Sequence, residues 1–188
     1  MTVKRKTIVI AFLLLLTACS GFTQEKNKTH LSFRSIFQEG IVAGESGTDL
    51  QLQFVSGVTY KILFAGAGIG LDYYYERSVP LFLDLRGKIF NRPSSPFLFA
   101  EGGYSFLWQK TKEVNQSNSS GGLFYELGIG YEVHIYKKLK LLFSSSYSYK
   151  SLSTTINTMP WVLPPPKEAI YKYDYSLRRI SLKAGLSF

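Results

Sequence analysis

Ten charged residues recur along this 188-residue chain at positions that alternate with apolar residues. If a fold encloses them together, carboxylates and cations in contact can carry protons or ions, or form a gate that opens when ion pairs break. An unpaired buried charge is very costly, so a paired network that neutralises its own charges is the favoured interpretation. The ten residues are Arg34, Asp72, Asp84, Arg86, Lys88, Glu101, Glu126, Glu132, Arg179 and Lys183.

The second kind of chemistry to consider is catalysis by a nucleophile, a base and an orienting group in contact. The chain has only two histidines, His30 and His134. His30 precedes the first expected strand, whereas His134 is expected to face inward near the end of its strand, paired with Glu132 or a neighbour. The pattern places no serine beside His134, and no metal or nucleotide motif occurs. We therefore expect no enzyme activity and no cofactor.

The elements that position these residues are strands, because apolar residues recur with a period of two. The clearest case is residues 123–135, where Leu123, Leu127 and Ile129 alternate with Glu126 and Glu132. The pattern predicts an all-β fold, an eight-stranded antiparallel up-and-down transmembrane β-barrel. The expected strands lie near 30–42 and 49–60, then at 63–75, 81–89, 98–108, 123–135 and 139–149, and over a last strand to the C-terminus.

Alternation alone does not decide which face meets lipid, since a soluble lipocalin-like barrel has its apolar face inside. Three features favour a membrane barrel. The polar face mixes both charge signs with glycine, Phe188 ends the chain in phase with the apolar face, and aromatic residues gather near one barrel end as an interface girdle. The girdle residues are Tyr73, Tyr75, Tyr104, Phe106, Trp108, Tyr125, Tyr147 and Tyr149.

The last strand changes phase along its length. Its final residues, 179–188, alternate in the membrane phase, but Tyr171, Tyr173 and Tyr175 keep the opposite phase. The change predicts either a bulge near Arg178 or an extension of the strand above the membrane.

Three stretches of strand pattern resemble a known family. The segments 66–74 (GAGIGLDYY), 79–86 (VPLFLDLR) and 96–106 (PFLFAEGGYSF) are similar to the small, OmpA-like outer-membrane β-barrel domain common in Bacteroidota. The resemblance covers nearly all of the chain after residue 29, and the weak first strand departs from it most. It implies that the outer-membrane assembly machinery reads the terminal strand, with Phe188 as the signal.

The N-terminus reads as an export signal. Lys4, Arg5 and Lys6 precede a short apolar run that ends near Cys19, which predicts a signal peptide over 1–19, a short segment over 20–29 and the barrel over 30–188. Cys19 is the only cysteine, and it is either lipidated or removed with the signal.

The charge suggests a membrane surface as partner. The net charge of +9 falls by three to +6 without the signal lysines and arginine, and the remaining basic residues are scattered. This excludes nucleic acid and favours outer-membrane lipid and lipopolysaccharide as partners.

The longest expected outer loop, 153–168, contains a stiff apolar stretch with three candidates for an interaction: Met159, Trp161 and Leu163. We expect a structural or surface-interaction role, without a wide pore and with the outside partner unidentified. Two alternatives stay open: an enzyme that modifies lipid A, and a soluble or lipid-anchored lipocalin-like barrel that binds lipid.

Overall fold

The computed structural model describes residues 31–108, 117–136, 139–158 and 169–188. All regular elements in these ranges are strands, and Leu31–Phe188 forms one compact unit. Within them no helix is long and apolar enough to cross a membrane. The strands are β1 (Leu31–Gly44), β2 (Gly47–Tyr60), β3 (Leu63–Asp72), β4 (Ser78–Lys88), β5 (Ser95–Leu107), β6 (Ser117–Ser120), β7 (Gly122–Tyr136), β8 (Leu139–Thr158) and β9 (Ala169–Ser187).

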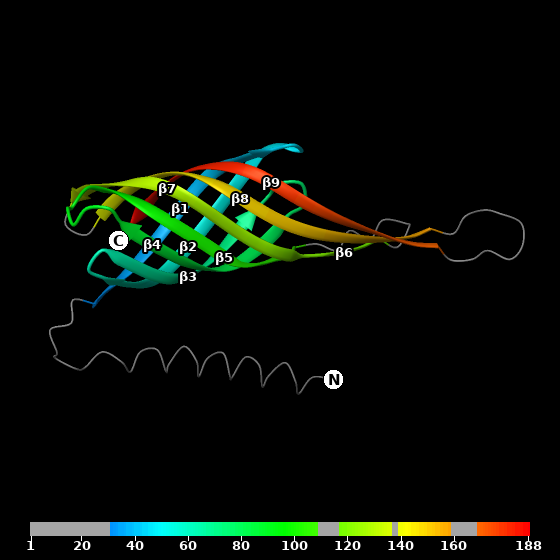
Figure 1. Ribbon diagram of the computed structural model, residues 1–188, viewed down its shortest axis with the longest axis horizontal. Coiled ribbons are helices and arrows are strands. Elements are labelled where there is room, and N and C mark those ends of the chain that lie inside the picture. The colour runs from blue at the N-terminus through cyan, green and yellow to red at the C-terminus, as the bar shows by residue number, and fades with distance from the viewer. Residues whose placement is uncertain (1–30, 109–116, 137–138, 159–168) are drawn as a thin grey trace, which may run out of the picture. The chain divides into compact units, whose positions relative to one another are not determined.

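The strands close into a barrel (Figure 1). Each of β1 to β4 pairs antiparallel with the next strand in the chain, β5 pairs with β7, β7 pairs with β8, and β9 pairs with both β8 and β1. The four-residue β6 pairs with β8 beyond the end of β7, so β6 extends one side of the structure and the wall itself has eight strands. The predicted fold class is confirmed.

The register gives the barrel its tilt. Following paired residues from Arg34 through β2, β3, β4, β5, β7, β8 and β9 leads back to β1 at Gly44, ten residues further along. With the usual strand spacings, a stagger of ten over eight strands corresponds to a tilt of about 40°. Eight strands leave an interior just wide enough for side chains to fill.

The barrel closes where the last strand meets the first. The Phe188 N–H donates to the Ser35 carbonyl over 3.0 Å, and the Ser35 N–H donates to the Phe188 carbonyl over 2.9 Å. Inside the seam, Arg34 Nε donates to Ser187 Oγ over 2.6 Å. Phe188 therefore takes part in closing the wall, and its side chain is exposed on the outside.

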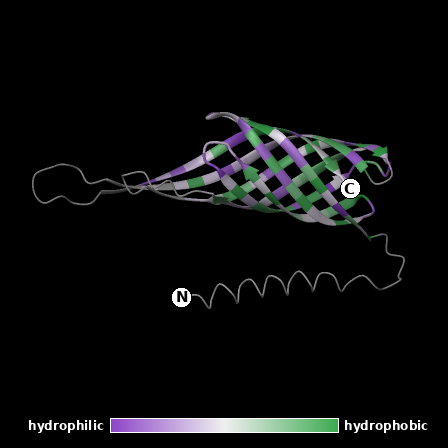
Figure 2. Cartoon of the chain, turned by 180° about the vertical axis from the view of Figure 1, so that it is seen from behind, coloured by the Kyte–Doolittle hydropathy of each residue, from purple (hydrophilic) through white to green (hydrophobic). Residues whose placement is uncertain are grey.

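Apolar side chains cover the outside of the wall, and charged side chains lie inside it. Leu83, Leu127 and Ile180 are each more than half exposed, whereas Asp84, Glu126 and Arg179 are at most 1% exposed. Blocks of apolar and polar residues alternate along the strands in Figure 2. A soluble ligand-binding barrel has the opposite arrangement, so the expected orientation of the faces is confirmed.

The interior also holds apolar side chains, which sequence reasoning missed. The expectation that the inward face is polar or glycine is wrong for eight buried residues in one cluster: Ile36, Val55, Phe64, Phe82, Phe97, Phe99, Phe124 and Leu142. Glycines make room for these rings. A Cβ at Gly68 would lie 2.5 Å from the Phe82 ring, and one at Gly128 would lie 2.6 Å from the Phe99 ring.

Two adjacent glycines of β5 give a matched test of this close packing. A Cβ at Gly103 would meet backbone, with the Phe82 Cα only 2.6 Å away, while one at Gly102 meets nothing within 4 Å. We expect Gly103→Ala to lower the free energy of unfolding by about 1–3 kcal/mol because the wall is overpacked there. Gly102→Ala should leave that free energy unchanged or slightly raised. Urea unfolding in lipid vesicles measures both, and equal effects would contradict the packing argument.

The strands β8 and β9 continue past the barrel. Their pairing runs without interruption from Lys140 opposite Ser187 to Thr158 opposite Ala169. Of the two predictions for the phase change near Arg178, the extension is therefore right, and the bulge is absent from this pairing.

Candidate functional site

The charged residues inside the barrel meet at three levels. Outer-membrane barrels keep their short turns in the periplasm, so the end with the turns after β2, β4 and β7 is called the periplasmic end. There Glu132 pairs with three cations, Arg34 at 2.5 Å and Lys88 and Lys140 at 2.7 Å each. One carboxylate thus ties together side chains from β1, β4, β7 and β8.

The middle level is a chain of alternating charges. Lys183 Nζ lies 2.7 Å from Glu126 and 3.5 Å from Glu101, while Arg86 lies 2.6 Å from Asp84 and 3.6 Å from Glu101. Neutral polar groups complete this level, because hydroxyls on β8 and β9 donate to Glu126 and two glutamines join the chain. These groups are Ser146, Ser181, Gln38 and Gln53.

The level nearest the opposite, extracellular end is centred on Asp72. Its carboxylate lies 2.5 Å from Arg179 Nη1 and 3.5 Å from Lys150 Nζ, and all three side chains are fully buried. Arg179 also donates to Ser148 Oγ over 2.7 Å. Two buried cations therefore share the Asp72 carboxylate at this level.

Tyr74, in the connection between β3 and β4, covers these groups. Its side chain is 1% exposed, its ring lies 5.4 Å from the Arg179 guanidinium, and its hydroxyl accepts from the Ser46 N–H over 2.8 Å. Lys150 Nζ donates to the carbonyls of Tyr74 and Glu76 over 3.3 and 3.1 Å. This connection thus joins the β1–β2 turn to β8 and β9 across the barrel mouth.

The structure brings all ten predicted charged residues into these three levels. Sequence reasoning missed Lys140 and Lys150 as members, so the five predicted cations become seven against five carboxylates. Lys150 continues the phase of Ser146 and Ser148, and Tyr74 that of Asp72, so extending the alternation past the assumed strand ends would have found both.

Other sequence-based candidates have different positions. His134 pairs with Lys140 and keeps the inward phase of Glu132, but its side chain is exposed at the periplasmic end of the barrel, and its backbone N–H donates to Ser94 Oγ over 3.1 Å. The residues after Val133 on β7 are all exposed, although the pairing with β8 continues to Tyr136 with a register shift. The remaining candidates, together with the segments 1–19 and 20–29, lie outside the described residues: Cys19, His30, Met159, Trp161 and Leu163.

Beyond the barrel, β6 and the ends of β8 and β9 form a ribbon (Figure 1). The pairing of β9 with β1 stops at Arg179, and the ten residues 169–178 of β9 pair with β8 alone among the described strands. At about 3.3 Å per residue, this extension spans about 30 Å. Tyr173 is 47% exposed on it, and the Tyr175 ring lies 5.5 Å from that of Tyr75.

Comparison with known proteins places this architecture among outer-membrane barrels. The crystal structure of OprG from Pseudomonas aeruginosa matches with a TM-score of 0.50 and 11% identity, over 83% of this chain and 95% of that one. The solid-state NMR structure of the outer membrane protein AlkL matches with 0.50 and 12%, over 88% and 93%. No family model and no curated protein sequence matches. The chain has the fold of these proteins and lies in the bacterial outer membrane.

Proposed function

We propose that this protein is a closed outer-membrane barrel that holds a rigid surface for contacts outside the cell, without catalysis. The observation that carries the proposal is the ribbon, because β8 and β9 stay paired for ten residues beyond the last contact of β9 with β1. Loops and extensions on a rigid scaffold are the usual place for binding. The edge of residues 169–178 of β9, which no other described strand than β8 pairs with, also offers backbone groups to an added strand.

The filled interior supports a role other than a pore. Ion pairs cross the barrel at three levels, and Tyr74 covers the level around Asp72 at the extracellular mouth. The proposal includes three partners of the protein: lipopolysaccharide, outer-membrane lipid and the outer-membrane assembly machinery. The proposal also includes membership of the barrel family common in Bacteroidota, which the strand patterns of 66–74, 79–86 and 96–106 support.

The test separates the ribbon from the barrel. In a shortened variant, residues 151–176 are replaced by a tight turn that joins Lys150 to Leu177, which face each other. The variant should still fold, as a heat-dependent gel shift will show, but cells carrying it should bind immobilised lipopolysaccharide and neighbouring cells less than cells with the full chain. Equal binding by both would overturn the proposal.

A second candidate function, an ion or proton path, rests on polar atoms inside the barrel. Both amide atoms of Gln51 and the hydroxyls of Ser78 and Ser105 are buried and have no hydrogen-bond partner in the part of the chain that the structure describes. Such groups usually hold ordered water, and a file of water can conduct. We expect no stepwise conductance in planar bilayers, because the charges are paired and Tyr74 covers the mouth. Conductance that Glu101→Gln alters would favour the path instead.

The alternative of a lipid A-modifying enzyme is tested separately. In the described residues His134 is exposed at the periplasmic end and has no serine hydroxyl bonded to its ring. We therefore expect lipid A from cells with and without the protein to have the same mass spectrum. A difference of one acyl chain would contradict this.

A further inference from the structure

One charged side chain faces the wrong way for this barrel. Glu39 of β1 is exposed on the outer wall, between Phe37 and Ile41, which are 44% and 46% exposed. Its neighbours across the strands are also apolar, Leu52 on β2 and Ala184 on β9. Among the described residues the Glu39 carboxylate has no hydrogen-bond or ion-pair partner.

The position of Glu39 along β1 places it deep in the lipid. It lies eight residues from Leu31 at the periplasmic end and five from Gly44 at the other. At about 2.5 Å of height per residue in a tilted strand, Glu39 is more than 10 Å from either end of β1. A polar group without a partner in hydrocarbon is costly, and ionisable residues at such depth are typical of functional contacts.

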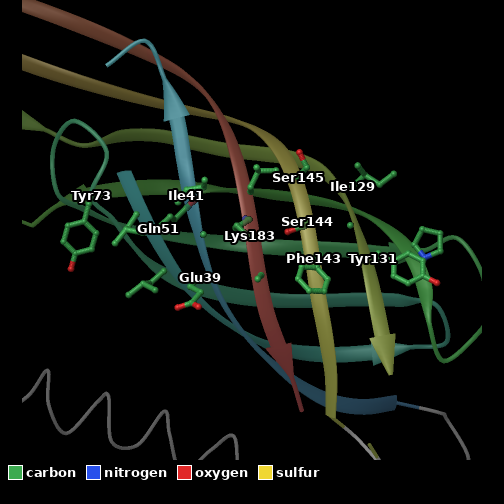
Figure 3. Close-up of a pocket in the computed structure, with 17 residues that line it drawn as sticks. Glu39, Ile41, Gln51, Tyr73, Ile129, Tyr131, Phe143, Ser144, Ser145 and Lys183 are labelled. Carbon is green, nitrogen blue, oxygen red and sulfur yellow. The ribbon is translucent and has the colours of Figure 1, made fainter. Parts of the chain in front are cut away.

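The wall is hollowed around Glu39. A concavity of about 1100 Å³ runs across neighbouring strands, and large side chains such as Tyr73 and Tyr131 flank it (Figure 3). Two small residues, Gly40 of β1 and Ala184 of β9, line it together with larger ones such as Leu182. Small residues on a lipid-facing surface allow another protein wall to approach closely.

A second polar group lies in the same hollow. Ser145 of β8 is exposed on the outer wall and has no partner for its hydroxyl among the described residues. In Figure 3 Ser145 and Glu39 lie on opposite sides of β9.

The two groups lie at the same depth. Ala184 pairs with Glu39 on one side and with Phe143 on the other, and Ser145 is two residues further up β8 than Phe143. Because the strands are tilted, going from Glu39 across β9 to Phe143 on β8 lowers the height in the membrane by about 6 Å. Going two residues up β8, from Phe143 to Ser145, raises it again by about 5 Å. An acceptor and a donor thus lie about 12 Å apart along the wall at equal depth, and the line between them passes between Ala184 and Leu182 of β9.

We infer that two copies of this protein pair in the membrane through the outer face of β1, β9 and β8, with Glu39 of each copy bonded to Ser145 of the other. The membrane holds both copies in the same orientation, so a twofold axis between them runs along the bilayer normal and preserves depth. A contact across such an axis is reciprocal. Equal depth of donor and acceptor on either side of β9 is what this symmetry requires.

The oligomeric state of the full-length chain in lipid vesicles tests the inference, with copies counted by single-molecule photobleaching at several protein-to-lipid ratios. We expect a dimer for the natural chain. Glu39→Ser and Ser145→Ala should each weaken dimerisation about tenfold or more, because two symmetric hydrogen bonds are lost. The double variant Glu39→Ser with Ser145→Glu exchanges the two groups and should restore the dimer.

The matched control is Leu83→Ala on β4, which is exposed to lipid on a strand far from β9 and should not change the dimer. The heat-dependent gel shift confirms that each variant is folded. A monomeric natural chain, or a dimer that none of the Glu39 and Ser145 variants weakens, would overturn the inference. Loss of the dimer in Leu83→Ala as well would show that the pairing uses another surface and would also overturn it.

Discussion

Replacing Asp72 with asparagine is expected to lower the free energy of unfolding of the barrel by about 3–5 kcal/mol, the usual cost of breaking a buried ion pair from one side. Arg179 and Lys150 both pair with this carboxylate, and neither has access to solvent. A neutral amide in place of the carboxylate would leave two buried cations without the ion-pair partner that they share. Urea unfolding of the protein in lipid vesicles measures the change, and the temperature of the gel-mobility shift should fall with it.

The matched control is Asp174→Asn on the ribbon. Asp174 lies 3.6 Å from Lys172, but both side chains are about two-thirds exposed, and exposed pairs contribute little. The same chemical change there should leave unfolding within error of the natural chain. If Asp72→Asn were as mild as Asp174→Asn, the level around Asp72 would have to be hydrated, and the mouth would not be closed.

Replacing Phe99 with alanine is expected to cost a similar amount, about 3–5 kcal/mol, through the cavity that it leaves. The Phe99 ring is 4% exposed, lies against the backbone near Gly128, and lies 5.4 Å from the Arg86 guanidinium and 5.1 Å from Lys183 Nζ. Its loss opens space beside the central ion pairs. The same urea titration measures it.

The control for Phe99 is its neighbour in the chain. Leu98 is 56% exposed on the lipid side, so Leu98→Ala removes apolar contact with lipid but creates no interior cavity. Its effect should be clearly smaller. Equal losses for the two variants would mean that the interior collapses around the missing ring.

The alternation of residue types predicted the wall of this barrel well because the pleat of a strand enforces a period of two. Leu123, Leu127 and Ile129 face lipid, and Glu126 and Glu132 face inward, as expected. The same rule assigned the ten charged residues to one face. It could not say which of them meet, because the pairing of Glu126 with Lys183 depends on the stagger between β7 and β9.

The interior rings were missed for a different reason. Phe82 and Phe99 lie between apolar outward residues, so the sequence there reads as a continuous apolar run without a polar face. Only the glycines opposite them, such as Gly68 and Gly128, signal that the rings turn inward.

The weakness of the first expected strand now has a physical explanation. In β1 the buried Ile36 and Val42 are apolar, and the exposed Glu39 is charged, so three positions reverse the usual assignment of faces. A pattern that expects apolar residues outside and polar residues inside is broken at those three positions.

The closure of the seam sets the order in which this protein can be built. Arg34 and Ser187, whose side chains are bonded across the seam, are 153 residues apart in the chain. Contacts so distant in sequence form late and slowly, because the ends of a long segment must first be brought together. The hairpins along the chain can form from strands that are close in sequence. One edge of β1, however, stays unpaired until β9 has formed and pairs with it. Before the barrel closes, the protein is therefore most prone to wrong strand pairing, and the unpaired edge of β1 has to be shielded from other strands.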